Sequence, residues 1–320
     1  MSSDSQTRKN KRISLQSLTP WFDTYQNVYY SNNESHNSKA IDWPRAIPFI
    51  ALHLACLLVF IVGWSVVAVF VAVALYVVRM FAITAFYHRY FSHKTFKTNR
   101  FMQFLFALLG ATAVQRGALW WAAHHRIHHA TADKETDQHS PKRHGFLWSH
   151  MCWFLTRENF STRHESIRDF SKYPELTFLD RFDILIPVIF AALLFFTGYL
   201  LEIYAPTLET NGPQLLVWGF FVSTVVLYHG TFTINSLAHL IGKKVFPGKD
   251  DSRNNFWLAL ITLGEGWHNN HHYYPGSARQ GFLWWEIDLT YYGLKMLEKL
   301  GLIWGLRPVP ERVLNIRKKR

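Results

Sequence analysis

The sequence has little cysteine and no apolar leader. Its 320 residues include only two cysteines, Cys56 and Cys152, which lie far apart in the chain. A disulfide framework and a Cys-x-x-Cys metal site are therefore excluded. The first 40 residues are polar and lack the apolar run of a signal peptide. We expect residues 1–42 to form a polar, partly disordered arm.

Charged residues are missing from one long stretch, since residues 46–78 contain no Asp, Glu, Lys or Arg. A hydrocarbon core about 30 Å thick needs about 20 helical residues, so this stretch is too long for one span. The Gly-Trp-Ser sequence at 63–65 is the expected corner. Together with two later apolar runs, it predicts spans over about 47–62, 66–87, 182–204 and 215–236.

Lysine and arginine are absent from both short connectors, because none occurs between Arg45 and Arg79 or between Arg181 and Lys243. The positive-inside rule then assigns the basic segments and both termini to the cytoplasm. We predict an all-α integral membrane protein with four transmembrane helices in two hairpins and a helical cytoplasmic cap. Its membrane domain covers 43–300, with cytoplasmic blocks at 88–181 and 237–300 and a basic tail at 301–320.

The residues that are abundant agree with this architecture, since 49% of the chain is hydrophobic and 17% is aromatic. The net charge of +12 lies beside the predicted spans. There, anionic headgroups and acidic substrates are commoner partners than nucleic acid. We therefore expect membrane lipids as partners and no nucleic acid. The apolar helix expected at 101–114 is too short to span and belongs at the interface.

Histidine is the other abundant residue, and eight of the 17 imidazoles, counted without His124, fall in three motifs: "HRYFSH" from His88, "HHRIHH" from His124 and "GEGWHNNHH" from Gly264. The second and third motifs have i, i+3, i+4 spacing, which predicts three rings on one helix face around a common centre. His88 and His93 are five residues apart, about 140° around an α-helix, so they converge only if the helix bends or ends between them.

All three motifs lie at the same predicted end of the spans, so they can meet. Eight imidazoles are too many for one four-coordinate zinc, and two metals fit better. Imidazole suits Zn, Cu, Fe and Ni, and the His-Glu-x-x-His pattern of zinc hydrolases is absent. A pair of irons that activates dioxygen is the best physical candidate. The candidate ligands are His88, His93, His125, His128, His129, His268, His271 and His272.

The stretch "NSLAH" adds two candidates near the end of the fourth span. Asn235 and His239 are four residues apart, on one face of the predicted helix. We expect His239 to be a ninth ligand and Asn235 to hold a metal-bound water. His124, Asp133, Asp137 and Glu265 are candidates for orienting the ligating rings. Inside the spans, His53 and His229 are expected to hydrogen-bond between helices, whereas His36, His139, His144, His150 and His164 are expected to be exposed or interfacial.

Together, these motifs resemble the three histidine boxes and the extra histidine of the membrane fatty acid desaturases, in order, spacing and membrane placement. The likeness is greatest to bacterial Δ9 desaturases of the stearoyl-CoA type. It covers about Trp43 to Arg279, including "FKTNR" and "GFLWSH". It implies an O2-dependent di-iron oxidoreductase that forms a cis double bond in a saturated long-chain acyl-CoA. The nine histidines would bind the two irons, and Asn235 would bind one of them through water.

The resemblance also implies partners and a location. Electrons would come from a separate ferredoxin-, rubredoxin- or cytochrome b5-like carrier and its reductase, because the His-Pro-Gly-Gly haem motif of fused relatives is absent. A bacterial inner membrane is expected rather than the endoplasmic reticulum. The chain departs from animal relatives at His124, where they have Asp.

A long acyl chain needs an apolar tunnel, and Trp120, Trp121 and Trp267 are candidates to line it, although such residues also anchor proteins at the interface. Coenzyme A phosphates would need basic partners. Lys142, Arg143, Arg157 and Arg163 are the candidates, and lipid headgroups are an equal alternative for them.

Other functions stay open at this point. The substrate could be an acyl-lipid, and a fatty acyl hydroxylase or monooxygenase would use the same motifs. A metal transporter would also need histidines, but it should place them at the midplane of several spans.

Overall fold

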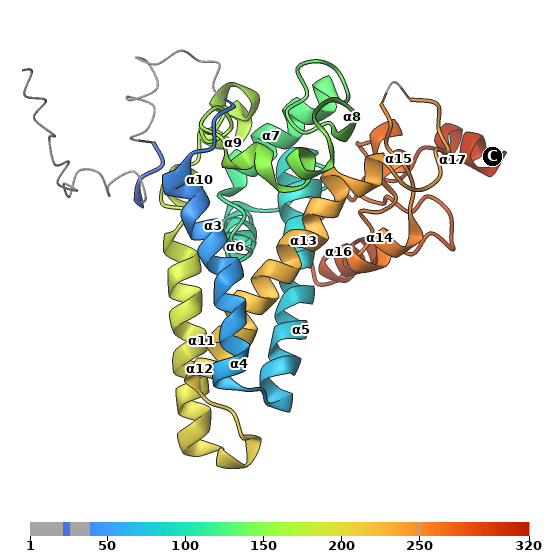
Figure 1. Ribbon diagram of the computed structural model, residues 1–320. Helices are drawn as coiled ribbons and strands as arrows, with labels where there is room; N and C mark the ends of the chain where they lie inside the picture. The colour runs from blue at the N-terminus through green and yellow to red at the C-terminus, as the bar shows by residue number, and fades with distance from the viewer. Residues whose placement is uncertain (1–21, 26–38, 249, 320) are drawn as a thin grey trace, which may run out of the picture.

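The computed structural model describes residues 22–25, 39–248 and 250–319. Within these ranges the chain is helical and has no β-strand, only isolated bridges. Four helices are long and apolar enough to cross a membrane, which confirms the predicted fold class: Trp43–Val62, Val66–Ser92, Leu185–Tyr204 and Gly212–His239. They form a bundle with a cap of shorter helices at one end (Figure 1). Most of the predicted arm, residues 1–42, lies outside the described ranges.

The first hairpin turns at the predicted corner. Its first helix ends at Gly63, whose φ of 67° is in the left-handed region that favours glycine. Ser65 then caps the next helix by accepting a hydrogen bond from the Ala68 N–H. The hairpin consists of α3 (Trp43–Ala55), η2 (Cys56–Leu58), α4 (Val59–Val62), α5 (Val66–Phe81) and the π-helix η3 (Ala82–Ser92).

The second hairpin packs against the first. Arg79 of α5 is buried in the bundle, where its guanidinium donates to the hydroxyls of Ser223 (2.6 Å) and Thr224 (2.7 Å). These bonds satisfy a charge that would otherwise be costly in an apolar bundle. The hairpin consists of α11 (Leu185–Tyr204), α12 (Gly212–Gln214), the π-helix η8 (Leu215–Val222), α13 (Ser223–Asn235) and η9 (Leu237–His239).

The cap is built around an apolar core where η3 leaves the bundle. The Phe86 ring stacks on Phe106 at 3.9 Å between centroids. A Cβ at Gly110 would lie 2.0 Å from the Tyr87 ring, so this close approach requires glycine. The larger helices of the cap are α6 (Arg100–Ala111), α7 (Ala118–Thr131), α10 (Pro174–Arg181), α14 (Phe256–Ile261), α15 (His268–Tyr273), α16 (Leu289–Lys299) and α17 (Glu311–Lys318). As expected from the sequence, α6 is too short to span.

Residues 301–319 pack onto this cap, although the sequence suggested a separate basic tail. Ile303 and Val313 are buried, and Arg317 of α17 pairs with the buried Glu286. The Ala278 N–H also donates to the Arg307 carbonyl at 2.9 Å. The described end of the chain is therefore part of the same folded unit.

Three histidines from separate segments form a hydrogen-bonded row in the bundle. The His53 Nδ1–H donates to the Phe49 carbonyl, so its Nε2 accepts from His229 Nε2 at 3.2 Å. The other nitrogen of His229, Nδ1, then accepts from His150 Nε2 at 3.0 Å. The predicted helix–helix bond between His53 and His229 is confirmed. The expected exposure of His150 is wrong, because its ring is buried against α13.

We predict that His229→Leu destabilises the bundle, because it removes both hydrogen bonds of this row. At roughly 0.5–1 kcal/mol per bond, the loss is about 1–2 kcal/mol, or a Tm lower by about 2–5 °C. Thermal unfolding of the purified protein in detergent measures it. Thr197→Val is the matched control, since the Thr197 hydroxyl donates to Leu193 within its own helix. Equal melting of the two variants would contradict a cross-helix role for the row.

Candidate metal centre

The nine candidate histidines lie in two adjacent groups where the bundle meets the cap. In each group, one ring nitrogen per histidine lies within 4.8 Å of the corresponding nitrogen of every other member. We call them site A and site B. Site A contains His88, His93, His125, His129 and His271, and site B contains His128, His239, His268 and His272.

Each helical motif supplies both sites. On α7, His125 and His129 belong to site A, and His128 belongs to site B. On α15, His271 belongs to site A, and His268 and His272 belong to site B. The expectation of one centre per motif was wrong, because consecutive helical residues point about 100° apart. The three rings of one motif therefore point to two neighbouring centres, which places site A and site B side by side.

His88 and His93 converge for a different reason. They lie on η3, where i→i+5 hydrogen bonds replace the α-helical pattern. The His93 N–H donates to the His88 carbonyl at 3.3 Å, and the helix ends at Ser92. The ring centroids are 4.9 Å apart. The expected helix end between these histidines is confirmed, and the π-helical winding is an addition that the sequence did not predict.

The ring nitrogens of site A make more contacts with one another than hydrogen bonds can account for. Four Nε2–Nε2 contacts of 2.9–3.0 Å join all five rings in a row. A neutral imidazole nitrogen either carries one proton or accepts one. The four contacts therefore cannot all be hydrogen bonds. Converging lone pairs fit a cation that would bind them together.

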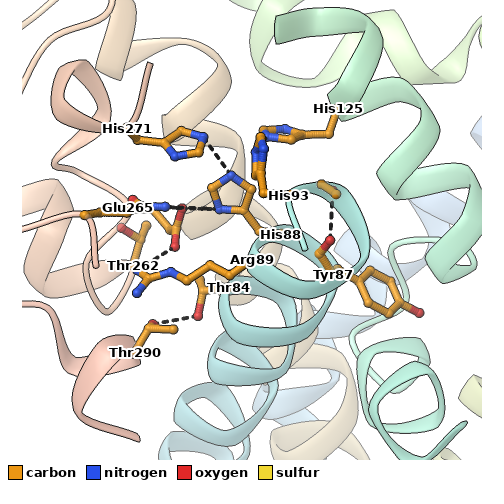
Figure 2. Close-up of polar contacts among 12 residues, drawn as sticks. Thr84, Tyr87, His88, Arg89, His93, His125, Thr262, Glu265, His271 and Thr290 are labelled. Carbon is orange, nitrogen blue, oxygen red and sulfur yellow. Dashed lines mark hydrogen bonds and ion pairs between the residues drawn. The ribbon is translucent and has the colours of Figure 1, made fainter. Parts of the chain in front are cut away.

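Glu265 determines which nitrogen of His88 faces inward (Figure 2). Its Oε2 lies 2.5 Å from His88 Nδ1, so that nitrogen holds the proton and Nε2 faces site A. The carboxylate is held in turn by Arg89 at 3.1 Å and Gln280 at 2.9 Å. Although Glu265 and His268 have the Glu-x-x-His spacing of carboxylate-bridged di-iron proteins, Glu265 contacts the outer nitrogen of a ring and belongs to neither site.

Site B is surrounded by three carboxylates, each facing the Nδ1 of a different ring. Asp137 lies 3.2 Å from His128, Asp133 lies 3.4 Å from His239, and Asp250 lies 3.4 Å from His272. The Nε2 of His272 is buried and has no hydrogen-bond partner among the described residues. An inward lone pair of this kind fits a bound cation. Asp137 and Asp133 were candidates from the sequence, and Asp250 was missed.

The charge states of site B favour metal binding. Burial raises the pKa of Asp137 and Asp250, but the hydrogen bonds from His128 and His272 outweigh it and bring both below the usual range. Burial lowers the pKa of the His272 imidazole to about 4. Near neutral pH Asp137 and Asp250 are therefore carboxylates, and the His272 imidazole is neutral. A neutral imidazole is the form that binds a metal.

Two other histidines of this region lie outside sites A and B. His124 is buried, with its Nδ1 2.8 Å from Gln138 and its Nε2 3.4 Å from the Ser161 carbonyl, so its hydrogen bonds go to the cap rather than to a site ring. His139, which was expected to be exposed, is buried and stacks on the His128 ring at 4.2 Å. The His128 and His139 rings form a third small group with Asp137. Asp137 already accepts from two backbone N–H groups as well as facing His128, so it acts there as an acceptor.

The fourth span ends differently from the expectation. Helix α13 stops at Asn235, and His239 lies in the separate η9 turn, so the two residues do not share one helix face. The structure nevertheless places both at the centre. His239 belongs to site B, and Asn235 lines the small cavity beside both sites.

Two cavities meet at the metal centre. One has a volume of about 50 Å³ and is lined by rings of both sites. The other has a volume of about 270 Å³ and lies between α3, α7, α13 and the start of α11. Trp121, Thr231 and Asn235 line both cavities, so the two cavities are adjacent, and we call these three residues the neck. Trp120 lines the larger cavity, whereas Trp267 lines neither and donates its indole N–H to the Ile287 carbonyl.

The four basic residues expected at a tunnel mouth do not line either cavity. Lys142 pairs with Asp251 at 2.8 Å, and Arg143 donates to the Asp133 carbonyl at 3.2 Å. Arg163 donates to the Glu158 carbonyl, and the Arg157 N–H donates to the Ala40 carbonyl. The cavity instead has Arg45 and Arg116 in its wall, which sequence reasoning missed because only the fold brings them together.

Comparisons with known proteins agree with this geometry. The sequence model of the fatty acid desaturase family matches residues 21–299. The chain is 36% identical to an sn-2 palmitoyl-lipid 9-desaturase of Nostoc sp. (strain 36), over 84% of this chain and 91% of the relative. It is 35% identical to an sn-1 stearoyl-lipid 9-desaturase of Anabaena variabilis (82% and 92%) and 37% identical to an acyl-CoA 5-desaturase of Anemone leveillei (82% and 78%).

We predict that Asp250→Asn weakens metal binding at site B, because the His272 ring loses the acceptor that fixes its orientation. Such changes typically lower metal affinity about 10–100-fold. Metal analysis after dialysis against a graded chelator measures the loss. Asp251→Asn is the matched control, since the neighbouring Asp251 pairs with the exposed Lys142. If both variants retain metal like the unmodified protein, Asp250 does not orient a ligand.

Proposed function

Because this chain belongs to the fatty acid desaturase family, we propose that it introduces a cis Δ9 double bond into a saturated long-chain acyl group of a membrane lipid. The chain is an oxidoreductase acting on fatty acyl groups, and the finer proposal concerns the bond position and the carrier of the acyl chain. The observation that carries it is the 270 Å³ cavity, which shares the neck residues with the smaller cavity beside the two histidine groups.

The nine histidines of sites A and B would hold two iron ions. When bound, the irons supply the dioxygen chemistry needed to break unactivated C–H bonds, which side chains cannot do alone. Glu265, Asp137, Asp133 and Asp250 keep the ring lone pairs directed inward. Asn235, which lines both cavities, would hold a metal-bound water. The electrons would come from a separate ferredoxin-, rubredoxin- or cytochrome b5-like carrier.

The neck would select the carbons that react. The Trp121 ring stacks on His125 with the centroids 5.1 Å apart. The Gln115 amide donates to the hydroxyl of Thr231, another neck residue, at 2.8 Å. These contacts fix the width of the passage where an acyl chain would meet site A. A rigid, narrow passage holds one carbon pair in front of the metals and keeps water out.

Three observations support a lipid-bound acyl chain, rather than acyl-CoA, as the proposed substrate. The basic residues expected for coenzyme A line neither cavity. The cavity wall includes Pro44 and Pro48 of α3 and Pro187 of α11, which are two of the membrane-length helices. Two of the relatives act on palmitoyl-lipid and stearoyl-lipid. The basic segments at the cap end of the spans favour a cytoplasmic cap.

The proposal is tested by expressing the chain in a host with saturated membrane lipids. Gas chromatography with double-bond location should show Δ9 monounsaturated chains. His271→Ala should lower the product at least 100-fold, because site A loses the ring that bridges His88 and His129. His164→Ala is the matched control, since His164 contacts Ser171 and Tyr25 away from both sites.

Two outcomes would contradict the proposal. A hydroxylated product would indicate oxygen insertion, and metal-loaded protein that leaves every saturated chain unchanged would exclude desaturation. Metal analysis should find about two irons per chain in active protein.

A further inference from the structure

Three arginine–aspartate pairs surround one end of the 270 Å³ cavity. Arg45 pairs with Asp42, Arg116 pairs with Asp183 at 2.5 Å, and Arg181 pairs with Asp23 at 2.6 Å. Thr24, Arg45, Arg116 and Asp183 line the cavity directly. We call these three pairs the Arg–Asp rim. They come from distant parts of the chain, so only the fold assembles them.

The rim lies where the first and third membrane-length helices meet the cap. Arg45 is in the first turn of α3, and Asp183 comes just before α11 begins at Leu185. The Thr24 hydroxyl reaches the rim from the N-terminal side and donates to the Arg181 carbonyl at 3.1 Å. At this depth, a rim residue faces the headgroup region of a bilayer rather than its hydrocarbon core.

The rim carries no excess positive charge. Each guanidinium has a carboxylate partner, and the Arg45 and Arg116 groups also lie against the Phe160 ring. A fourth carboxyl group, Asp180, is buried beside them and accepts from the Trp120 N–H and the Thr162 hydroxyl. It adds either no charge or a negative one. One N–H of Arg45, one of Arg116 and two of Arg181 are therefore already directed at carboxylates of the protein.

A charge-balanced rim discriminates against anionic substrates. Coenzyme A phosphates and anionic headgroups bind through unpaired Arg or Lys donors. Here such a group would have to displace a carboxylate and lie beside it, which costs desolvation and like-charge repulsion. A headgroup without net charge meets both donors and acceptors and leaves the pairs intact. Discrimination of this kind arises from penalising the wrong partner.

We propose that the Arg–Asp rim selects lipids whose headgroup has zero net charge and rejects acyl-CoA and anionic lipids. The proposal rests on the proposed desaturase function and specifies its substrate. A zwitterionic phospholipid and an uncharged glycolipid share the required chemistry. Arg116 and Asp183 are the specificity-determining pair, because both lie in the cavity wall.

The test is a competition with the full-length iron-loaded enzyme in detergent and a reducing system. The substrates are dipalmitoyl phosphatidylethanolamine, dipalmitoyl galactosyldiacylglycerol, dipalmitoyl phosphatidylglycerol and palmitoyl-CoA in one mixture. Mass spectrometry of the monounsaturated products gives the ratio between them. We expect at least tenfold more product from one of the two neutral lipids than from either anionic substrate. Comparing the two neutral lipids with each other shows whether the preferred headgroup is zwitterionic or a sugar.

One rim variant disturbs the charge balance, and a double variant restores it. Asp183→Asn leaves the Arg116 charge unpaired, so the anionic-to-neutral product ratio should rise about tenfold. Asp183→Asn combined with Arg116→Gln restores the balance and should restore the ratio. Glu175→Gln is the matched control. Glu175 is in the first turn of α10, at the opposite end from Arg181 of the rim, and its replacement leaves Arg100 of α6 without this carboxylate partner. Since the ratio is measured within one sample, a partial loss of folded enzyme cancels.

A second readout separates this proposal from the proposed function. Binding of the same four substrates to metal-free protein can be measured by intrinsic tryptophan fluorescence. We expect the same selectivity there in the absence of catalysis. Equal binding of neutral and anionic lipids, or an Asp183→Asn ratio equal to that of Glu175→Gln, would overturn the rim proposal. Selective binding without any unsaturated product would instead overturn the desaturase function and leave the rim proposal standing.

Discussion

The structure depends on keeping nine imidazole rings facing inward at one end of a membrane-length bundle. Burial lowers the pKa of rings such as His125 and His271 well below the usual range, so their lone pairs are free. The Nε2 of His271 faces two other Nε2 atoms at 2.9–3.0 Å, and because one nitrogen cannot satisfy both contacts by hydrogen bonds, a shared cation fits them better. The surrounding carboxylates decide which nitrogen of each ring keeps its proton. Buried groups such as Arg89 and Gln280 hold those carboxylates in place.

The two sites are chemically unequal. Site A has five rings, and one of them, His88, faces a carboxylate. Site B has four rings, and three of them face carboxylates. Hydrogen bonds to carboxylates make imidazole a stronger donor. Site B therefore has more carboxylates around its rings than site A, although the same two helices, α7 and α15, contribute rings to both.

The same elements that hold the rings also form the wall of the cavity. Trp121 comes one helical turn before His125 on α7, and Thr231 comes one turn before Asn235 on α13. A substrate chain in the large cavity would thus be placed by the helices that place the metals. Apolar residues such as Phe49 and Leu52 line this cavity, and Arg45 and Arg116 of the Arg–Asp rim lie in its wall.

The sequence by itself determined the four spans, the corner at Gly63 and the nine histidines, because hydropathy, charge placement and side-chain chemistry are local properties. It also indicated Asp137 and Glu265, which are close to the motifs in the chain. Only the tertiary structure decided how the rings divide between two sites, because that depends on where α7 and α15 cross. It likewise decided that Asp250 faces His272 and that Arg116 meets Asp183 at the cavity. These pairs are formed by elements that pack together from separate parts of the chain, and no local pattern records such packing.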